Sequence, residues 1–486
     1  MVRFTVLLVC FCLFSNENTA QMQANALQQS QIKRGYGMFI HFGINTFNET
    51  EWSDGKLPVS SYNPHKLDCD QWVKTAKEAG FRYVILITKH HDGFCLWNSQ
   101  YTDYDVAASP VKTDVVAEVA KACKKYGIQL GLYYSLWDRH EPAHKDKNPQ
   151  VYVDFMKNQL TELLTNYGTI CELWFDGGWA KKDSAWHIPE LYQHIKKLQP
   201  KCLVTVNHTI GKHEKISSIQ LPTDMKENDP IRFFPVDFRT KDPNFARWDD
   251  PKVYVYDQKQ YYLPFEHTLC LSDRGNWFQK KNALPVRGVD ELEALFYWCT
   301  ANDNILIINV PPDQRGQIRA HERLCLLELA DRLRIRNGKK TLPKSAKNEL
   351  FNKPITATNM ANNPKNTPQK ANDFSLETWW TAADSTATLE IDMEKSTPFN
   401  RLVLMEYPSM IDLKDGFSQI RQFHVEQFRI DIMNDNQWET IYVGSTMGAC
   451  KIISLPVNKT AIKLRIAILK SSQVPSISHI AMYSKA

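Results

Sequence analysis

The chain of 486 residues is too long for one ordinary domain, because domains average roughly 150 residues and an α/β barrel takes about 250. Its hydrophobic share of 43% and charged share of 23% exclude a disordered chain and a multi-span membrane protein. A net charge of only +5 argues against nucleic acid as a partner, since proteins that bind nucleic acid concentrate Lys and Arg. The 13 Trp residues instead indicate a ligand with a flat apolar face.

The first 20 residues have the pattern of a secretory signal peptide. Arg3 precedes an apolar run over residues 6–14, and Thr19 and Ala20 supply the small residues of a cleavage site. This run is about half the ~18 residues that a membrane span needs, and no later run reaches that length. We therefore expect an exported protein, periplasmic or extracellular, with no membrane span.

Residues 35–316 alternate short apolar runs with longer amphipathic segments, which is the pattern of parallel strands joined by helices. Near-continuous apolar strands predict burial on both faces, as in a (β/α)8-like TIM barrel. An eighth strand is not evident, and the Asp- and Pro-rich stretch 216–264 is expected to form loops around a site. The expected strands are residues 37–41, 83–88, 129–135, 171–176, 203–207, 268–271 and 305–310, and the expected helices are 69–79, 114–126, 151–166, 188–198 and 290–299.

The pattern changes after residues 332–353, which are rich in Arg, Lys and turn residues. Residues 388–392, 401–405 and 428–432 alternate with period two, which predicts an all-β sandwich. We therefore expect an α/β barrel over residues 21–345 and a β-sandwich over residues 346–486.

Chemically active residues follow the first four expected strands. His41 ends the first, His90 and His91 the second, Tyr133 lies near the end of the third, and Asp176 ends the fourth. Functional groups of a barrel gather at the carboxyl ends of its strands, so these side chains are expected to converge.

Three chemistries could use this set. His41, His90, His91 and Asp176 could ligate a metal in a hydrolase, but adjacent His residues on a strand point to opposite faces. Nucleotide chemistry lacks a phosphate-binding loop here. Glycoside hydrolysis fits best, because it needs two carboxyl groups, donors for hydroxyls and an aromatic wall. We therefore expect no metal and no cofactor.

The order of several motifs carries a specific resemblance across residues 33–320. The chain resembles the family 29 glycoside hydrolases, which are retaining α-L-fucosidases. The motifs are Ile40-His41-Phe42-Gly43, Glu51-Trp52, Lys89-His90-His91-Asp92-Gly93-Phe94, Trp174-Phe175-Asp176-Gly177 and Asn309-Val310-Pro311-Pro312-Asp313-Gln314-Arg315-Gly316.

The resemblance implies a role for each site residue. Asp176 is the implied catalytic nucleophile. Glu266 is the first choice for the general acid/base and Glu227 the second, and either would have to lie about 5–5.5 Å from Asp176. The implied hydroxyl-binding and nucleophile-supporting residues are His41, Glu51, His90, His91 and Tyr133, and the expected apolar wall is Trp52, Trp97, Trp137 and Trp277.

The implied substrate is a fucosylated oligosaccharide or glycoconjugate glycan that carries terminal α-linked L-fucose. The segments 51–55 and 275–278 look like the branch that cuts α-1,3/1,4 linkages. An α-L-galactosidase on the same fold and an inactive, secreted fucose-binding lectin are the alternatives.

The second domain begins with a Trp pair, Trp379 and Trp380, and resembles the discoidin or coagulation-factor type C modules. Paired Trp can stack on sugars, so this domain could contact glycan; a packing role is the alternative.

Two glycosylation sequons bear on the source. Asn48 lies three residues before Glu51, and Asn207 ends an expected core strand, so a glycan at either would obstruct the site or the barrel. This pattern favours a bacterial exported enzyme.

Overall fold

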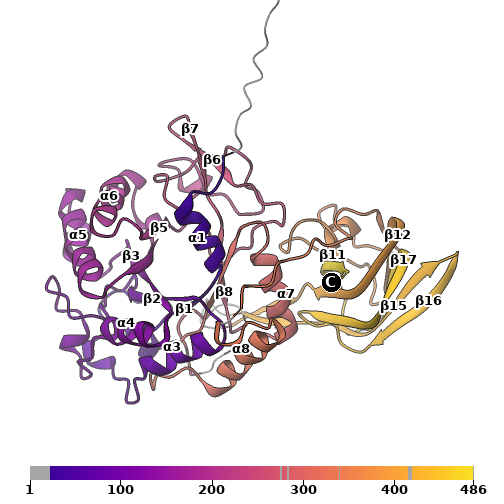
Figure 1. The fold of residues 1–486 in the computed structure, drawn as a ribbon, viewed down its shortest axis with the longest axis horizontal. Helices are drawn as coiled ribbons and strands as arrows, with labels where there is room; N and C mark the ends of the chain where they lie inside the picture. Colours follow the sequence, from indigo (N-terminus) through magenta and orange to yellow (C-terminus); the bar gives the residue numbers. More distant parts are fainter. Residues whose placement is uncertain (1–21, 274–275, 282–283, 339, 414–418, 485–486) are drawn as a thin grey trace, which may run out of the picture.

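The computed structural model describes residues 22–484 with gaps at 274–275, 282–283, 339 and 414–418. The predicted signal peptide at residues 1–20 lies outside the described residues. A barrel domain and an all-β domain lie side by side in Figure 1. No helix among the described residues is long and apolar enough to cross a membrane.

The barrel domain is built on a parallel sheet. In the described part of the chain, seven strands follow the order β5-β4-β3-β2-β1-β9-β8, and each neighbouring pair is parallel. This confirms the TIM-like architecture and the seven expected strands. The strands are β1 (Tyr36–Ile40), β2 (Tyr83–Lys89), β3 (Gln129–Ser135), β4 (Ile170–Asp176), β5 (Leu203–Val206), β8 (Glu266–Cys270) and β9 (Ile305–Asn309).

An irregular segment fills the gap between β5 and β8. The N–H of Asp237 donates to the carbonyl of Val204 in β5 at 2.9 Å. On the other side, Arg239 forms a parallel bridge with Phe265, directly before β8. Residues 237–240 therefore take the place of an eighth barrel strand, and the residues after them reach the carboxyl face of the barrel.

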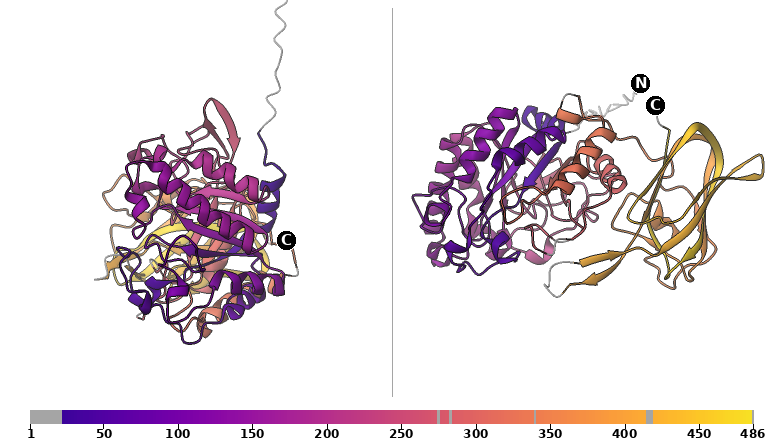
Figure 2. Two further views of the ribbon diagram at one scale, coloured as in Figure 1. Left: turned by 90° about the vertical axis from the view of Figure 1, so that its left-hand side faces the viewer. Right: turned by 90° about the horizontal axis from the view of Figure 1, so that it is seen from below.

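Helices cover the outside of the sheet (Figure 2). Asp68 and Asp114 cap the first two expected helices, because their carboxylates accept the N–H groups of Gln71 and Ala117. The expected helices are α3 (Cys69–Glu78), α4 (Val115–Tyr126), α5 (Pro149–Asn166), α6 (Ile188–Leu198) and α7 (Val289–Cys299); α1 (Ala26–Arg34), α2 (Ile44–Asn48) and α8 (Ala320–Arg332) were not expected.

A small hairpin, β6 (Val253–Tyr256) with β7 (Lys259–Tyr262), rises from the barrel. It packs on its own apolar cluster, which includes Met225 and Tyr254. The stretch 216–264 is therefore partly folded into a separate unit, whereas the sequence predicted only loops there.

The all-β domain is a sandwich, as expected. Helix α8 ends at Arg332 and β10 begins at Ile355, on either side of the predicted boundary. The expected strands at 388–392 and 401–405 are parts of one long strand, β12, whose register with β17 shifts between Asp392 and Thr397. The described strands of the all-β domain are β10 (Ile355–Ala357), β11 (Trp380–Thr381), β12 (Ala387–Glu406), β13 (Ser409–Asp412), β14 (Gln419–Gln422), β15 (Val425–Asn434), β16 (Gln437–Gly444), β17 (Lys451–Ser471) and β18 (Ser476–Tyr483).

The Trp pair of this domain is split between two environments. Trp380 is fully buried in the sandwich core, and the ring of Trp379 stacks on Tyr407 with centroids 3.7 Å apart. The two indoles therefore do not form a joint platform, and a glycan contact by this domain stays a prediction.

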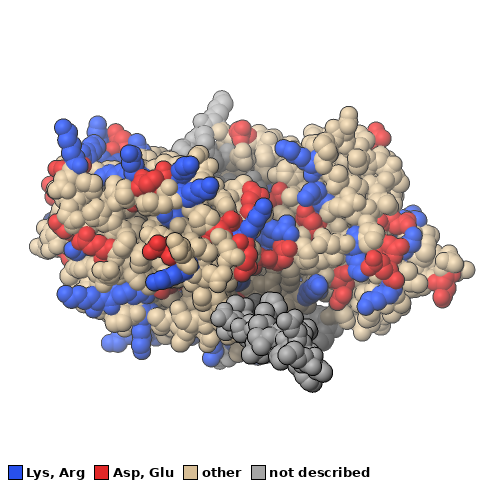
Figure 3. Space-filling model, turned by 90° about the horizontal axis from the view of Figure 1, so that it is seen from above, with Lys and Arg blue, Asp and Glu red and all other residues tan. Residues whose placement is uncertain are grey.

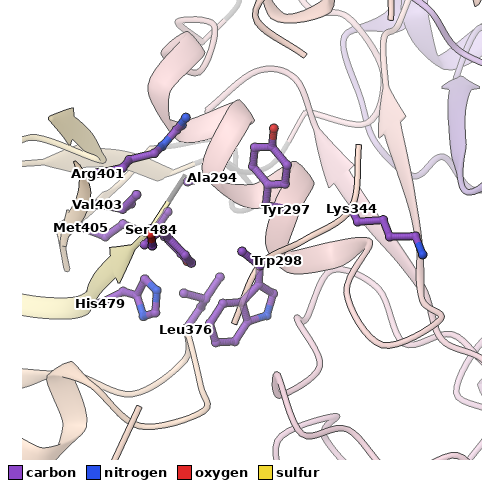
Figure 4. Close-up of a pocket in the computed structure, with 12 residues that line it drawn as sticks. Ala294, Tyr297, Trp298, Lys344, Leu376, Arg401, Val403, Met405, His479 and Ser484 are labelled. Atoms are coloured by element: carbon purple, nitrogen blue, oxygen red, sulfur yellow. The ribbon is translucent and has the colours of Figure 1, made fainter. Parts of the chain in front are cut away.

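The two domains meet across α7. Arg401 of β12 pairs with Glu293 of α7 at 2.6 Å. A cavity of about 330 Å³ lies beside this contact, with Trp298 of α7 on one side and Met405 and His479 on the other (Figure 4). The face in Figure 3 mixes acidic and basic side chains over both domains, in keeping with the small net charge.

Candidate active site

A cavity of about 240 Å³ opens at the carboxyl ends of β1 to β4. The ends of parallel barrel strands meet at one face, so residues far apart in sequence converge there. The cavity is lined by Phe39, His41, Glu51, Trp52, His90, His91, Tyr133, Trp174, Asp176, Trp179, Asp242, Pro243 and Trp277.

Asp176 ends β4, and its residue surface is 7% exposed. The Tyr133 hydroxyl donates to its Oδ2 at 2.8 Å, and the Asn207 amide donates to its Oδ1 at 3.0 Å. Burial raises the pKa of this carboxyl, while both hydrogen bonds oppose the shift because they stabilise the anion. Gly177 follows with φ of 77°, and a side chain there would meet the Cβ of Trp137 at 2.7 Å.

The three histidines lie around this carboxylate as neutral groups. His91 Nε2 lies 3.7 Å from Asp176 Oδ2, and His41 Nδ1 contacts the side chain of Asn309 at 2.8 Å. Burial lowers the pKa of His41 and of His91 to about 3, and it lowers the pKa of His90 well below its usual range. A neutral imidazole offers one donor and one acceptor, which suits the hydroxyl groups of a sugar.

A second carboxyl group, Asp242, lies beside Asp176. The Asn207 Nδ2 that donates to Asp176 also contacts Oδ1 of Asp242. Asn207 Oδ1 accepts the N–H groups of His208 at 2.9 Å and of Asp242 at 3.3 Å, which fixes the orientation of the amide. Two oxygens that contact one nitrogen are separated by no more than about 6 Å.

The two carboxyl groups differ in their surroundings. Burial, and then the negative charge of Asp176, raise the pKa of Asp242 to about 7. Asp176 receives the additional hydrogen bond from Tyr133, which favours its charged form. An ionised Asp176 therefore favours the protonated form of Asp242, so the two carboxyl groups differ in how readily they release a proton.

Glu51 is a third carboxyl group in the cavity. Its Oε2 accepts the N–H groups of Trp277 at 3.2 Å and Phe278 at 3.3 Å, and its Oε1 lies 3.5 Å from Lys280 Nζ. Burial raises the pKa of Glu51 to about 7, against the opposing effects of Lys280 and the two N–H groups. Glu51 thus holds the segment that carries Trp277.

Aromatic rings form the walls of the cavity. The ring centroid of Trp277 lies 5.0 Å from that of His41, and Asn309 Nδ2 donates to the Trp277 carbonyl at 2.9 Å. Trp52 is 41% exposed and stacks on Trp179 with centroids 6.3 Å apart. These rings offer flat apolar surfaces beside the polar groups, as a sugar ring requires.

His90, His91 and Asp176 could together hold a metal ion, because one ligand atom from each lies within 4.8 Å of the others. The carboxylate of Asp176 already accepts two hydrogen bonds, and His91 Nδ1 contacts the Ser135 hydroxyl at 2.7 Å. The same side chains could therefore bind either the hydroxyl groups of a ligand or a cation.

Comparison with known proteins decides the family. The family model for α-L-fucosidase matches residues 14–339. α-L-Fucosidase 1 of Arabidopsis thaliana is 30% identical over 482 residues, which span 94% of this chain and 86% of that protein. The chain belongs to the α-L-fucosidase family.

Solved structures share the fold of this α-L-fucosidase family member over most of its length. A glycoside hydrolase 29 family member from an unknown rumen bacterium is 25% identical, with a TM-score of 0.54 over 95% of this chain and 77% of that chain. A Ruminococcus gnavus GH29 fucosidase in complex with fucose is 23% identical, with a TM-score of 0.51 over 95% of each chain.

Most of the site residues predicted for this α-L-fucosidase family member lie together in the structure. They line the cavity described above and come from the ends of four strands, β1 to β4, and from two loops. They are His41, Glu51, Trp52, His90, His91, Tyr133, Asp176 and Trp277.

Two of the predicted wall residues lie outside the cavity lining. Trp97 is fully buried, and its indole N–H donates to Glu162 at 2.8 Å, so its position is structural and the prediction of a sugar contact is wrong. Trp137 packs against two of the lining residues: its ring centroid lies 5.3 Å from that of His91 and 5.9 Å from that of Trp52.

Glu266, the first choice for the acid/base, is placed inside the barrel. It is the first residue of β8, about 13 Å along the strand from Cys270 at the carboxyl end, at ~3.3 Å per residue. It is fully buried and accepts hydrogen bonds from the Tyr83 hydroxyl at 2.8 Å and the Trp174 indole at 2.9 Å. This residue satisfies polar groups of the core beneath the cavity, so the structure contradicts its predicted role.

Glu227, the second choice, is also away from the site. It is exposed on the unit that includes the β6–β7 hairpin, beside the N-terminal segment at Met22 and Gln23. Glu227 is not among the residues that line the cavity around Asp176, where the proton must be delivered, so the structure speaks against this choice as well.

Asn207, Asp242 and Trp179 are the site residues that the sequence did not reveal. Asn207 follows β5 and could have been found by the same strand-end argument that found Asp176. Asp242 follows residues 237–240, which show no strand periodicity, and Trp179 lies in a short helical turn after β4.

Proposed function

We propose that the protein is a retaining exo-α-L-fucosidase in which Asp176 is the nucleophile and Asp242 the general acid/base. The observation that supports this most is the shared contact of both carboxyl groups with Asn207 Nδ2. The two oxygens that share this nitrogen are at most about 6 Å apart, which is compatible with the ~5–5.5 Å between the carboxyl groups of retaining enzymes and favours it over the ~6.5–9.5 Å of inverting ones.

In the first step, Asp176 attacks the anomeric carbon and the bond from this carbon to the leaving oxygen breaks. Asp242 gives its proton to that oxygen, so the aglycone leaves as a neutral alcohol and a fucosyl ester forms on Asp176. The raised pKa of Asp242 keeps its proton available near neutral pH.

In the second step, water attacks the same carbon while Asp242, now ionised, accepts a proton from it. The ester bond breaks and Asp176 leaves as a carboxylate, which Tyr133 and Asn207 stabilise through their hydrogen bonds. Two inversions restore the α configuration in the released sugar.

The cavity supports removal of a single terminal sugar. Its volume of about 240 Å³ is below the ~300–1,000 Å³ of pockets that enclose drug-sized ligands. The fucose bound in the Ruminococcus gnavus relative supports fucose as that sugar. The apolar rings of Phe39 and Trp277 suit its methyl group better than the extra hydroxyl of L-galactose.

The test is hydrolysis of α-1,2-, α-1,3-, α-1,4- and α-1,6-fucosylated oligosaccharides beside the matching α-L-galactoside. We expect release of fucose, faster from the α-1,3 and α-1,4 linkages, and at least about tenfold slower release of L-galactose because a hydroxyl would replace the methyl group. The rates should be the same with EDTA present. Binding of fucosides without turnover of any would support the lectin alternative, and loss of activity with EDTA would support a metal hydrolase.

We further propose export of the mature protein from a bacterial cell. The signal-like residues 1–20 support this, and so does Asn207, a sequon residue that is 1% exposed and bound to Asp176. A glycan on that amide would remove the hydrogen bond to the nucleophile. In fractionated producing cells, we expect the protein outside the cytoplasm with an N-terminus near Gln21; protein found in the cytoplasm with an N-terminus at Met1 would contradict export.

A further inference from the structure

We propose that Arg421, in the all-β domain, is a positioning residue for the sugar cavity in the barrel. It would act by holding the segment that leads to Trp277. This inference rests on the proposed function, because Trp277 matters only if the cavity binds the sugar.

Arg421 lies at the contact between the domains. It is in β14, and Figure 2 (right) shows the β13–β14 hairpin reaching from the all-β domain towards the barrel. Its Nη1 and Nη2 donate to the two carboxylate oxygens of Glu291 in α7 at 2.7 and 2.8 Å. Its Nε contacts the carboxylate of Asp273. One guanidinium thus joins a helix of the barrel to the segment that follows β8.

All three charged groups are largely buried. The side chains of Arg421, Asp273 and Glu291 are 10%, 12% and 6% exposed. A bidentate Arg–carboxylate contact fixes both distance and orientation. Removing the guanidinium would leave the buried Asp273 without its ion-pair partner, whereas Glu291 would keep Arg287. A buried carboxylate without a paired cation is strongly unfavourable. The segment would therefore move to let water reach Asp273.

Asp273 lies four positions before Trp277 of the cavity wall in the sequence. Its N–H donates to the carbonyl of Pro285 at 2.6 Å, so both its backbone and its side chain are held. At the other end, Trp277 is held by Glu51 and Asn309 in the cavity. Asp273 and Trp277 are therefore each held by contacts of their own, and one contact of Asp273 comes from the all-β domain.

The chain offers a matched control in Arg401. This residue also lies in the all-β domain and also pairs with a buried carboxylate of α7, Glu293, at 2.6 Å. Among the described residues, Arg401 contacts Glu293 and Tyr297 of α7 but neither Asp273 nor Trp277. Arg401→Met therefore removes a comparable contact between the domains while leaving Asp273 with its partner.

The experiment compares Arg421→Met, Arg421→Lys and Arg401→Met with the intact wild-type protein, using 4-nitrophenyl α-L-fucoside. We expect Arg421→Met to raise KM about tenfold with kcat within about twofold, since Trp277 contacts the sugar before and during reaction. Arg421→Lys should recover part of the lost affinity, because it restores the charge without the bidentate contact. Arg401→Met should leave both constants within about twofold even if its thermal unfolding midpoint falls.

Equal kinetic constants for Arg421→Met and Arg401→Met, with both folded, would overturn the inference. If Arg421→Met does not fold, Asp273→Asn tests the same contact, because it weakens the interaction of Arg421 with residue 273 and keeps the ion pair of Arg421 with Glu291. An unchanged KM in Asp273→Asn would also overturn the inference. An inactive wild type would refute the proposed function instead. In that case the affinity for L-fucose, measured by calorimetry, tests Arg421 by itself: equal affinities in wild type and Arg421→Met would reject its role.

Discussion

Asp176→Asn is expected to lower kcat on 4-nitrophenyl α-L-fucoside by at least about 10⁴-fold, equivalent to ~5.5 kcal/mol of barrier. The amide cannot form the fucosyl ester, whereas the asparagine side chain can still accept the hydrogen bond from Tyr133. The thermal unfolding midpoint should not fall, because the change removes a buried charge. Steady-state kinetics and a thermal melt of the same preparation check both parts.

Azide provides a stereochemical control at the same position in a second variant, Asp176→Gly. Azide that takes the place of the missing carboxylate inverts the anomeric carbon once, so Asp176→Gly with azide should give the β-fucosyl azide. Turnover by Asp176→Asn within tenfold of wild type would refute the two-step mechanism with Asp176 as nucleophile.

Asp242→Asn is expected to lower kcat/KM on a natural fucosyl linkage by about 10²–10⁴-fold, the usual contribution of general acid catalysis. With an aryl fucoside, the rate of the first step should fall less, since nitrophenolate can leave without taking up a proton. Azide should restore turnover and yield the α-fucosyl azide, because it attacks the fucosyl ester in a second inversion. The configuration of the fucosyl azide therefore distinguishes the role of Asp176 from that of Asp242.

The pH dependence tests the same residue. The acid must carry its proton, so kcat/KM should fall as the pH rises through the pKa of about 7 that burial and Asp176 give Asp242. This fall should be absent in Asp242→Asn. Glu51 also has a pKa raised to about 7, so Glu51→Gln is the required comparison. If Glu51→Gln loses the alkaline fall and gains azide rescue while Asp242→Asn does not, Glu51 is the acid/base.

The fold and one half of the site could be predicted because the barrel repeats a local pattern. Each buried parallel strand is an uninterrupted apolar run, and the polar residue that ends it lies at the same face as the others. This rule alone places His41, His90, Tyr133 and Asp176 at one face of the barrel. Glu266 came from the family resemblance and not from this rule; the structure places it at the amino end of β8, away from the face where the strand-end residues meet.

The sequence by itself determined the TIM-like barrel, the sandwich after it and the position of Asp176, since these depend on periodicity within single elements. Only the tertiary structure decided the partner of Asp176. Asp242 reaches the site because residues 237–240 hydrogen-bond between β5 and β8 without strand periodicity. The contact of Arg421 with Asp273 joins two domains, and no local pattern encodes it. Contacts of this kind depend on how distant segments pack, which amino-acid spacing does not record.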